Sequence, residues 1–238
     1  MNTPGPATYH ALVRLQTQPI SIARTRLRAL AEERAVKDSE TCPWPPSEVV
    51  AFEQSGETAP ATAKDLQQLA VRVLAEIQHE LLNHDFAQGR TVKSLPLERD
   101  VQIWVANALH QKRGRSFTVV REEHVVNEKE PDIRLRGKGG DAVIAIEIKA
   151  TRSKWTVRQL EVALVDQLCR RYLRAVNGKY GILLLVHQDE RKWRDRDAGT
   201  VWLFQDVVAR LTAIAAKISC ERSDSPQPLV CVLDVSAC

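Results

Sequence analysis

The stretch AVIAIEIKA, residues 142 to 150, constrains the fold more than any other part of the chain. Valine and isoleucine favour strands, and a nearly continuous apolar run is typical of a central strand buried on both faces. Side chains alternate along a strand, so Glu147 and Lys149 lie on one face while three isoleucines lie on the other. Burying such charges without partners costs on the order of several kcal/mol. The sequence therefore predicts a buried strand with a charged partner beside it.

A divalent cation would be such a partner. Pro131 is tolerated at the start of a strand, so Asp132 begins the preceding strand, and pairing through the turn GKGGD can bring it next to Glu147. The two carboxylates and the backbone carbonyl of Ile148 offer hard oxygen ligands for Mg²⁺ or Mn²⁺. Such a metal lowers the pKa of a bound water and neutralises charge on a phosphate. Lys149 would orient the nucleophile or stabilise the developing phosphate charge.

The spacing of apolar residues predicts the elements around this strand. Helices are expected at 62–83, 96–112, 156–176 and 202–218, and further strands at 116–126, 131–137, 179–188 and 228–236. The third of these helices opens on a capping box formed by Thr156 and Gln159. The order helix, three strands, helix, strand predicts an α/β sandwich with a mixed central sheet.

The dipeptide PD at 131–132, fourteen further residues and the tripeptide EIK at 147–149 resemble the two halves of the PD-(D/E)xK nuclease motif. Over about residues 95 to 188 the element order is similar to the αβββαβ core of the restriction-endonuclease-like fold. The resemblance implies a Mg²⁺-dependent phosphodiester hydrolase, in which Mn²⁺ can substitute. Asp132 and Glu147 would be catalytic metal ligands, with Lys149 as a third catalytic residue. The activity it implies is that of a DNA endonuclease acting on double-stranded DNA.

The same resemblance suggests further site residues. Members often carry an acid on the helix before the first strand, for which Glu98 is preferred to Asp100; the alternative is that both are first-turn acids favoured by the helix dipole. The RecB-like branch has a glutamine and a tyrosine four residues apart after the motif. Here Gln167 and Tyr172 are five apart, roughly 140° around an α-helix. Gln167 would face the site or be a surface amide.

Three cations follow the catalytic strand closely, namely Arg152, Lys154 and Arg158, and they are candidate nucleic-acid contacts. The alternative is an ordinary solvated loop. The segment 189–197 mixes charges of both signs and is predicted to be an exposed loop.

Other notable side chains are expected to be structural. His124 and His187 lack a second metal ligand at suitable spacing, and Trp104 lies on the apolar face of its helix. Trp155 and Trp193 are near predicted loops, where packing is favoured over base stacking. The GKGG sequence is interpreted as a hairpin turn because no helix follows it, as a phosphate loop would require.

Composition excludes several classes of protein. The five cysteines are scattered and form no C-x-x-C pair, which argues against a disulfide framework or a zinc site and favours a reducing, cytoplasmic setting. No apolar run is long enough for a membrane span, and we expect no secretory signal. The net charge of +4 is compatible with nucleic acid without requiring it.

The expected organisation is a helical N-terminal region followed by the nuclease domain. Residues 1–37 would be a helical hairpin or the end of a helical repeat, 38–48 a proline-rich connector, 49–94 a helical region packing on the core, and 95–238 the nuclease domain. The whole is similar to nuclease domains at the C-termini of large bacterial proteins, some of them antiphage defence effectors. This similarity implies a homodimer or a larger sensor–effector assembly.

Two alternatives stay open. The chain could be an inactive nuclease-fold module that binds nucleic acid or a partner protein. It could also be an unrelated α/β protein in which Glu147 and Lys149 form a structural ion pair.

Overall fold

The computed structural model describes residues 6–16, 24–41, 59–83, 87–114, 116–121, 131–138, 140–174, 178–194, 201–222 and 224–238. The chain divides into two compact units, Met1–Ser55 and Gly56–Cys238.

The first unit contains α1 (Pro6–Gln16) and α2 (Arg24–Thr41), with Leu12 and Ala31 buried. Helix α2 continues past the predicted start of the connector at residue 38. Arg34 Nε donates to Asp38 Oδ1 at 2.9 Å, an i, i+4 pair of the kind that supports a helix. The prediction of a connector from 38 was therefore wrong for residues 38–41, and residues 42–48 lie outside the described chain.

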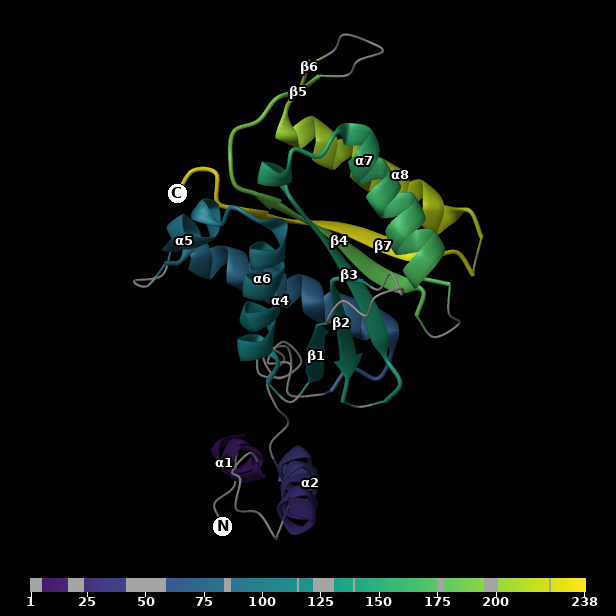
Figure 1. The fold of residues 1–238 in the computed structure, drawn as a ribbon. Coiled ribbons are helices and arrows are strands. Elements are labelled where there is room, and N and C mark those ends of the chain that lie inside the picture. The colour runs from purple at the N-terminus through teal and green to yellow at the C-terminus, as the bar shows by residue number, and fades with distance from the viewer. Residues whose placement is uncertain are drawn as a thin grey trace. The chain divides into compact units, whose positions relative to one another are not determined.

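The second unit is built on a five-stranded mixed sheet, as predicted (Figure 1). Its strands are β1 (Phe117–Arg121), β2 (Ile133–Gly137), β3 (Val143–Ala150), β4 (Tyr180–His187) and β7 (Gln227–Asp234), in that spatial order. β1, β2 and β3 pair antiparallel, whereas β3, β4 and β7 pair parallel. The central strand is thus β3. The part of the first predicted strand from residue 122 to 126 falls outside the described residues.

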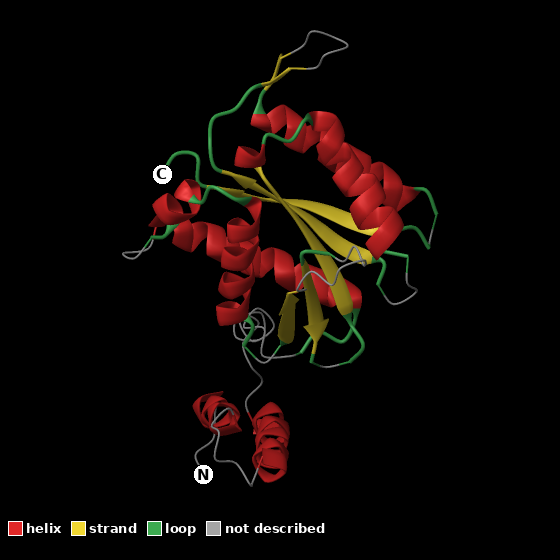
Figure 2. Ribbon diagram, viewed as in Figure 1, coloured by secondary structure: helices red, strands yellow, loops and turns green. Residues whose placement is uncertain are grey.

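Helices cover both faces of this sheet (Figure 2). On one face lie α4 (Ala63–Asn83), α5 (Gly89–Ser94) and α6 (Glu98–Lys112); on the other lie α7 (Val157–Val162), the π-helix η2 (Ala163–Tyr172) and α8 (Phe204–Cys220). The isoleucines of β3 pack in the first core, which contains the buried residues of α4 and α6. Ala145 packs in the second core, which contains the buried residues of η2 and α8. The alternation predicted for this strand is confirmed, and the capping box of Thr156 and Gln159 opens α7 as expected.

Two segments differ from the predictions. Helix α5 lies between the helices expected at 62–83 and 96–112, where no separate helix was predicted. Strands β5 (Trp193–Arg194) and β6 (Val201–Trp202) pair in a small antiparallel sheet. Trp193 is only 3% exposed and belongs to the second core. The prediction of an exposed loop was therefore wrong at Trp193. Burial of its large apolar indole is favourable, and this side chain packs in the second core.

The helix after β3 is wound more loosely than an α-helix in its second half. Leu173 N donates to Leu168 O at 3.1 Å, which closes an i to i−5 turn. Its buried side chains repeat every five residues, at Ala163, Leu168 and Leu173, so this row faces the sheet. Residues five apart in η2 therefore lie one turn above each other on the same face.

Candidate active site

The pairing of β2 with β3 places Asp132 beside Glu147. Ile133 is opposite Ile146 in the antiparallel register, so the preceding residue on β2 faces the following residue on β3. Asp132 Oδ2 accepts a hydrogen bond of 2.7 Å from the backbone N–H of Ile148. The carboxylate of Asp132 is thereby tied to the strand that carries Glu147, as the sequence predicted.

Lys149 lies at the centre of a charged cluster. Its Nζ atom is 2.8 Å from Glu147 Oε1 and 3.5 Å from Glu98 Oε1. The ammonium also lies over the ring of Trp155, 4.8 Å from its centroid. Glu147 is 5% exposed and Lys149 is 6% exposed, so little water screens these interactions. Glu147 and Lys149 therefore form a buried ion pair, and Glu98 is a second carboxylate close to the Lys149 ammonium.

Glu98 is the first residue of α6, and its side chain reaches the end of β3. Its Oε2 atom accepts from the backbone N–H of Ala150 at 3.1 Å and from Trp155 Nε1 at 2.6 Å. A side chain with these partners does more than balance a helix dipole. Asp100, the other acid considered, has no hydrogen bond or ion pair with the described residues of this cluster.

Burial and neighbouring charges shift the pKa values of this cluster. Burial, followed by the nearby charge of Glu147, raises the pKa of Asp132 to about 7. Burial also raises the pKa of Glu147, although Lys149 opposes this. For Lys149, burial alone would lower the pKa, but Glu147, Glu98 and Asp132 together outweigh it and raise the pKa. The lysine is therefore held in its charged form, whereas burial outweighs the nearby positive charges at Asp132 and Glu147 and raises the pKa of both carboxyl groups.

Two members of the cluster were missed in the sequence. Gln102 Nε2 donates to Asp132 Oδ1 at 2.8 Å, so the aspartate is held through both of its oxygens. Gln102 follows Glu98 by four residues and shares its helix face, a signal that the sequence did contain. Trp155 holds Glu98 and covers Lys149, whereas the sequence favoured simple packing.

The five-residue spacing of Gln167 and Tyr172 fits the π-helix. Both lie in η2, where an i to i+5 spacing returns to the same face. The expected separation of 140° assumed an α-helix and was wrong. The pKa of Tyr172 is raised by burial and then by the charges of Glu147 and Asp132, so its phenol lies within electrostatic range of the cluster. Gln167 Oε1 is buried and has no hydrogen-bond partner among the described residues.

The three candidate nucleic-acid contacts are exposed on the segment that follows β3. Arg152, in the short 3₁₀ turn η1 (Thr151–Ser153), donates to Ser94 O at 3.1 Å. Lys154 adopts a left-handed conformation with φ of 56°, which is unfavourable for a lysine. Arg158 is in the first turn of α7. None of the three joins the buried cluster, but all lie close along the chain to Lys149.

Other expectations had mixed outcomes. His187 Nδ1 lies 3.0 Å from Asp234 Oδ1, and its ring stacks on Phe204 at 3.9 Å, in agreement with a structural role. His124 lies outside the described residues. Trp104 is half-buried, and its Nε1 donates to Gln88 Oε1 at 2.9 Å. It packs against the first core, in agreement with its place on the apolar face of the helix, although it is not fully buried.

No protein-family model, curated protein or solved structure matches the chain. Within the described residues, no group of three or more His, Cys, Asp or Glu side chains is placed to hold a metal ion. Among the same residues, no helix combines the length and apolarity needed to cross a membrane.

Proposed function

We propose that the chain is a divalent-metal-dependent nuclease that hydrolyses phosphodiester bonds in DNA, built on a restriction-endonuclease-like fold. A buried excess of negative charge carries the proposal. The carboxylates of Asp132, Glu147 and Glu98 all act on one buried ammonium, that of Lys149. A structural ion pair needs only one carboxylate, whereas a divalent cation accounts for the others. The antiparallel and parallel pairings around β3 agree with the mixed sheet that the resemblance implies.

The residues present fit Mg²⁺. Asp132 and Glu147 are adjacent on neighbouring strands and offer carboxylate oxygens, and the backbone carbonyl of Ile148 is the third candidate ligand. Mg²⁺ usually keeps several waters and binds through only one or two carboxylates. A site of this kind needs no group of three acidic or histidine side chains. Glu98, which is already bonded to Ala150 and Trp155, would act from the second layer of contacts.

Bound Mg²⁺ would supply an activated water and neutralise part of the phosphate charge. The chain itself does the positioning. Gln102 and the N–H of Ile148 fix the orientation of the Asp132 carboxylate. Lys149, whose pKa is raised by the surrounding carboxylates, would stabilise negative charge on the scissile phosphate. The unpartnered Oε1 of Gln167 is available to accept a hydrogen bond from water or substrate.

The test is cleavage of plasmid DNA and of RNA by the full chain in Mg²⁺, Mn²⁺ or EDTA. We expect cleavage that depends on the metal and is abolished in Asp132→Ala and Lys149→Ala. Lys138→Ala, an exposed lysine at the turn between β2 and β3, is the matched control and should cleave like wild type. Thermal melting of each variant checks that it is folded.

Cleavage in EDTA, or equal cleavage by wild type and the two site variants, would overturn the proposal. Metal-dependent binding of DNA without cleavage would instead support the inactive nuclease-fold module. A folded protein with neither binding nor cleavage would leave the structural ion pair of Glu147 and Lys149 as the better account.

A further inference from the structure

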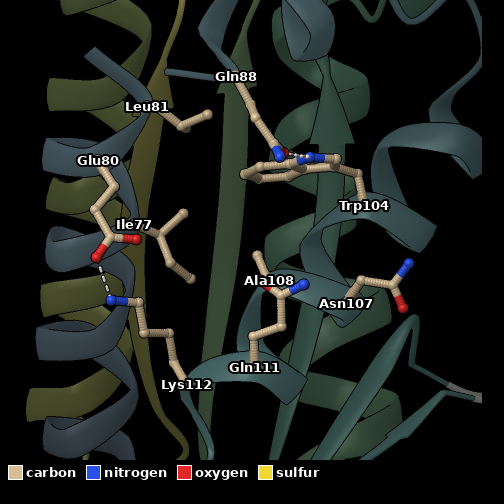
Figure 3. Close-up of a pocket in the computed structure, with 9 residues that line it drawn as sticks. All are labelled: Ile77, Glu80, Leu81, Gln88, Trp104, Asn107, Ala108, Gln111 and Lys112. Atoms are coloured by element: carbon tan, nitrogen blue, oxygen red, sulfur yellow. Dashed lines mark hydrogen bonds and ion pairs between the residues drawn. The ribbon is translucent and has the colours of Figure 1, made fainter. Parts of the chain in front are cut away.

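A second feature lies away from the buried charges, between α4 and α6. It is a pocket of about 400 Å³ with an apolar floor, formed by Ile77, Leu81 and Ala108 (Figure 3). Its volume falls within the range of small-molecule sites. Glu98 and Gln102 leave α6 toward β2 and β3, whereas Trp104 and Lys112 extend from α6 toward α4. Changes to the pocket therefore need not disturb the candidate active site.

The two ends of the pocket differ. At one end the indole of Trp104 lies beside Gln88, whose Oε1 accepts from the indole N–H at 2.9 Å (Figure 3). This hydrogen bond fixes the ring, so that one ring face borders the open space. At the other end Lys112 pairs with Glu80 and lies 3.9 Å from Glu76. The lysine is thus already neutralised, and the pocket offers no spare cation for a phosphate.

Carboxamides supply the remaining polar groups. Asn107 and Gln111 line the pocket, and neither side chain hydrogen-bonds to any other part of the described chain. A carboxamide presents a donor and an acceptor side by side, which is the pattern that matches the edge of a nucleobase. A fixed aromatic face stacks on the flat face of the same ligand.

From these contacts we infer that the pocket between α4 and α6 binds a purine base, as a free nucleoside or as an unpaired base in a single strand. Trp104 stacks on the base and the carboxamide of Gln111 contacts its edge. A purine is favoured over a pyrimidine because its two rings cover more of the indole. Since Lys112 is neutralised by Glu80, recognition lies in the base and not in a phosphate. The inference does not depend on the proposed nuclease activity.

The experiment is calorimetric titration of the full chain, in EDTA so that no metal-dependent cleavage occurs. The probes are adenosine, guanosine and uridine, together with oligodeoxyadenylate and oligothymidylate. We expect the purine nucleosides to bind more tightly than uridine. Trp104→Leu should weaken binding at least about 5-fold, the low end of the loss expected for one stacked base. Trp104→Phe should recover part of it.

Gln111→Leu should also weaken binding, and because Gln111 is exposed this variant keeps the fold. Trp202→Leu, a tryptophan on the other side of the sheet, is the matched control and should bind normally. Tighter binding of oligodeoxyadenylate than of adenosine identifies a base in a strand; equal binding identifies the free nucleoside. Either result supports the inference if it depends on Trp104.

The inference is overturned if no purine binds up to roughly 1 mM. It is also overturned if Trp104→Leu and Gln111→Leu bind like wild type. Self-association of the chain that Trp104→Leu abolishes would likewise overturn it, by making the pocket an interface between copies.

Discussion

The two faces of β3 have different tasks. Ile144, Ile146 and Ile148 point into the first core and are fully buried. On the opposite face Ala145 is followed by Glu147 and Lys149, which are almost as well buried but charged. The isoleucine face therefore stabilises the fold through the burial of apolar surface. The other face holds two charged groups where little water can solvate them. A strand built for stability alone would be apolar on both faces, so the charged face is the one to which the proposed function assigns a role.

The largest expected effect comes from making both faces apolar. Replacing Glu147 with Leu and Lys149 with Met in one double variant should abolish metal-dependent cleavage, a loss on the order of 100-fold or more. The same variant should unfold at equal or higher denaturant, with a gain of up to about 4 kcal/mol, because a buried ion pair is often no better than well-packed apolar groups. Urea unfolding and plasmid cleavage measure the two effects. A double variant that is much less stable than wild type would contradict the division of tasks.

Truncation of a side chain on the apolar face should lower stability and leave cleavage nearly unchanged, the opposite of the double variant. Ile146→Ala should lower the free energy of unfolding by about 2–5 kcal/mol, because it leaves a cavity in the first core. Cleavage at a temperature where the variant is folded should be nearly unchanged. Val120→Ala, at a partly exposed position of β1, is the control and should lose far less stability. A large loss of activity in folded Ile146→Ala would show that the two faces are not independent.

The pH dependence of stability should report on the charged face. The pKa of Asp132 is about 7 in the fold against an ordinary 3.8, so the folded state holds the proton more tightly than the unfolded state. Its stabilising contribution is full below pH 3.8 and is lost as the pH rises toward 7. In EDTA, the melting temperature of wild type should therefore fall relative to Asp132→Asn over this window.

Mg²⁺ should reverse this loss, because the metal binds the ionised carboxylate. Its stabilisation of wild type should be greater at pH 8 than at pH 5.5, and absent in Asp132→Asn. Melting curves with and without Mg²⁺ measure both trends. An effect of Mg²⁺ that does not change with pH would argue against Asp132 as a ligand.

The smallest expected effect is at Gln102, which touches the candidate site only through Asp132. Gln102→Leu should weaken the binding of Mg²⁺ roughly 10-fold, as expected when a group that orients a metal ligand is lost. The Mg²⁺ concentration that gives half-maximal cleavage should rise, whereas the rate at saturating Mg²⁺ should change less. Gln205→Leu, at an exposed glutamine of α8, serves as the control and should leave the Mg²⁺ requirement unaltered. A reduced maximal rate with an unchanged Mg²⁺ requirement would contradict a positioning role.

Local patterns were sufficient for most of the second unit. The alternation in β3 predicted which residues face each core, and the capping box predicted the start of α7. The closeness of Asp132 to Glu147 followed from the short turn between their strands. These features depend on neighbouring residues, and the period of a strand or helix is visible in the sequence itself.

Predictions were wrong where packing between distant segments decided the outcome. Trp193 was expected in a loop, but it is buried against the helices of the second core. Trp104 packs against the first core as expected for the apolar face of its helix, but it is only half-buried because it also borders the pocket between α4 and α6. An apolar residue shows a preference for burial, and only the arrangement of the helices decides whether a buried place exists.

For β3, residue type and alternation alone predict a central, buried strand with Glu147 and Lys149 on one face. The groups that surround these two side chains depend on the tertiary packing. Two of these groups, Glu98 and Gln102, come from α6, and the third, Trp155, follows the turn after β3. All three reach the site through side-chain contacts. The π-helical winding of η2 was not expected from the sequence, and it brings Gln167 and Tyr172 onto one face. Periodicity is a local property, whereas the surroundings of a buried charge depend on how the layers pack.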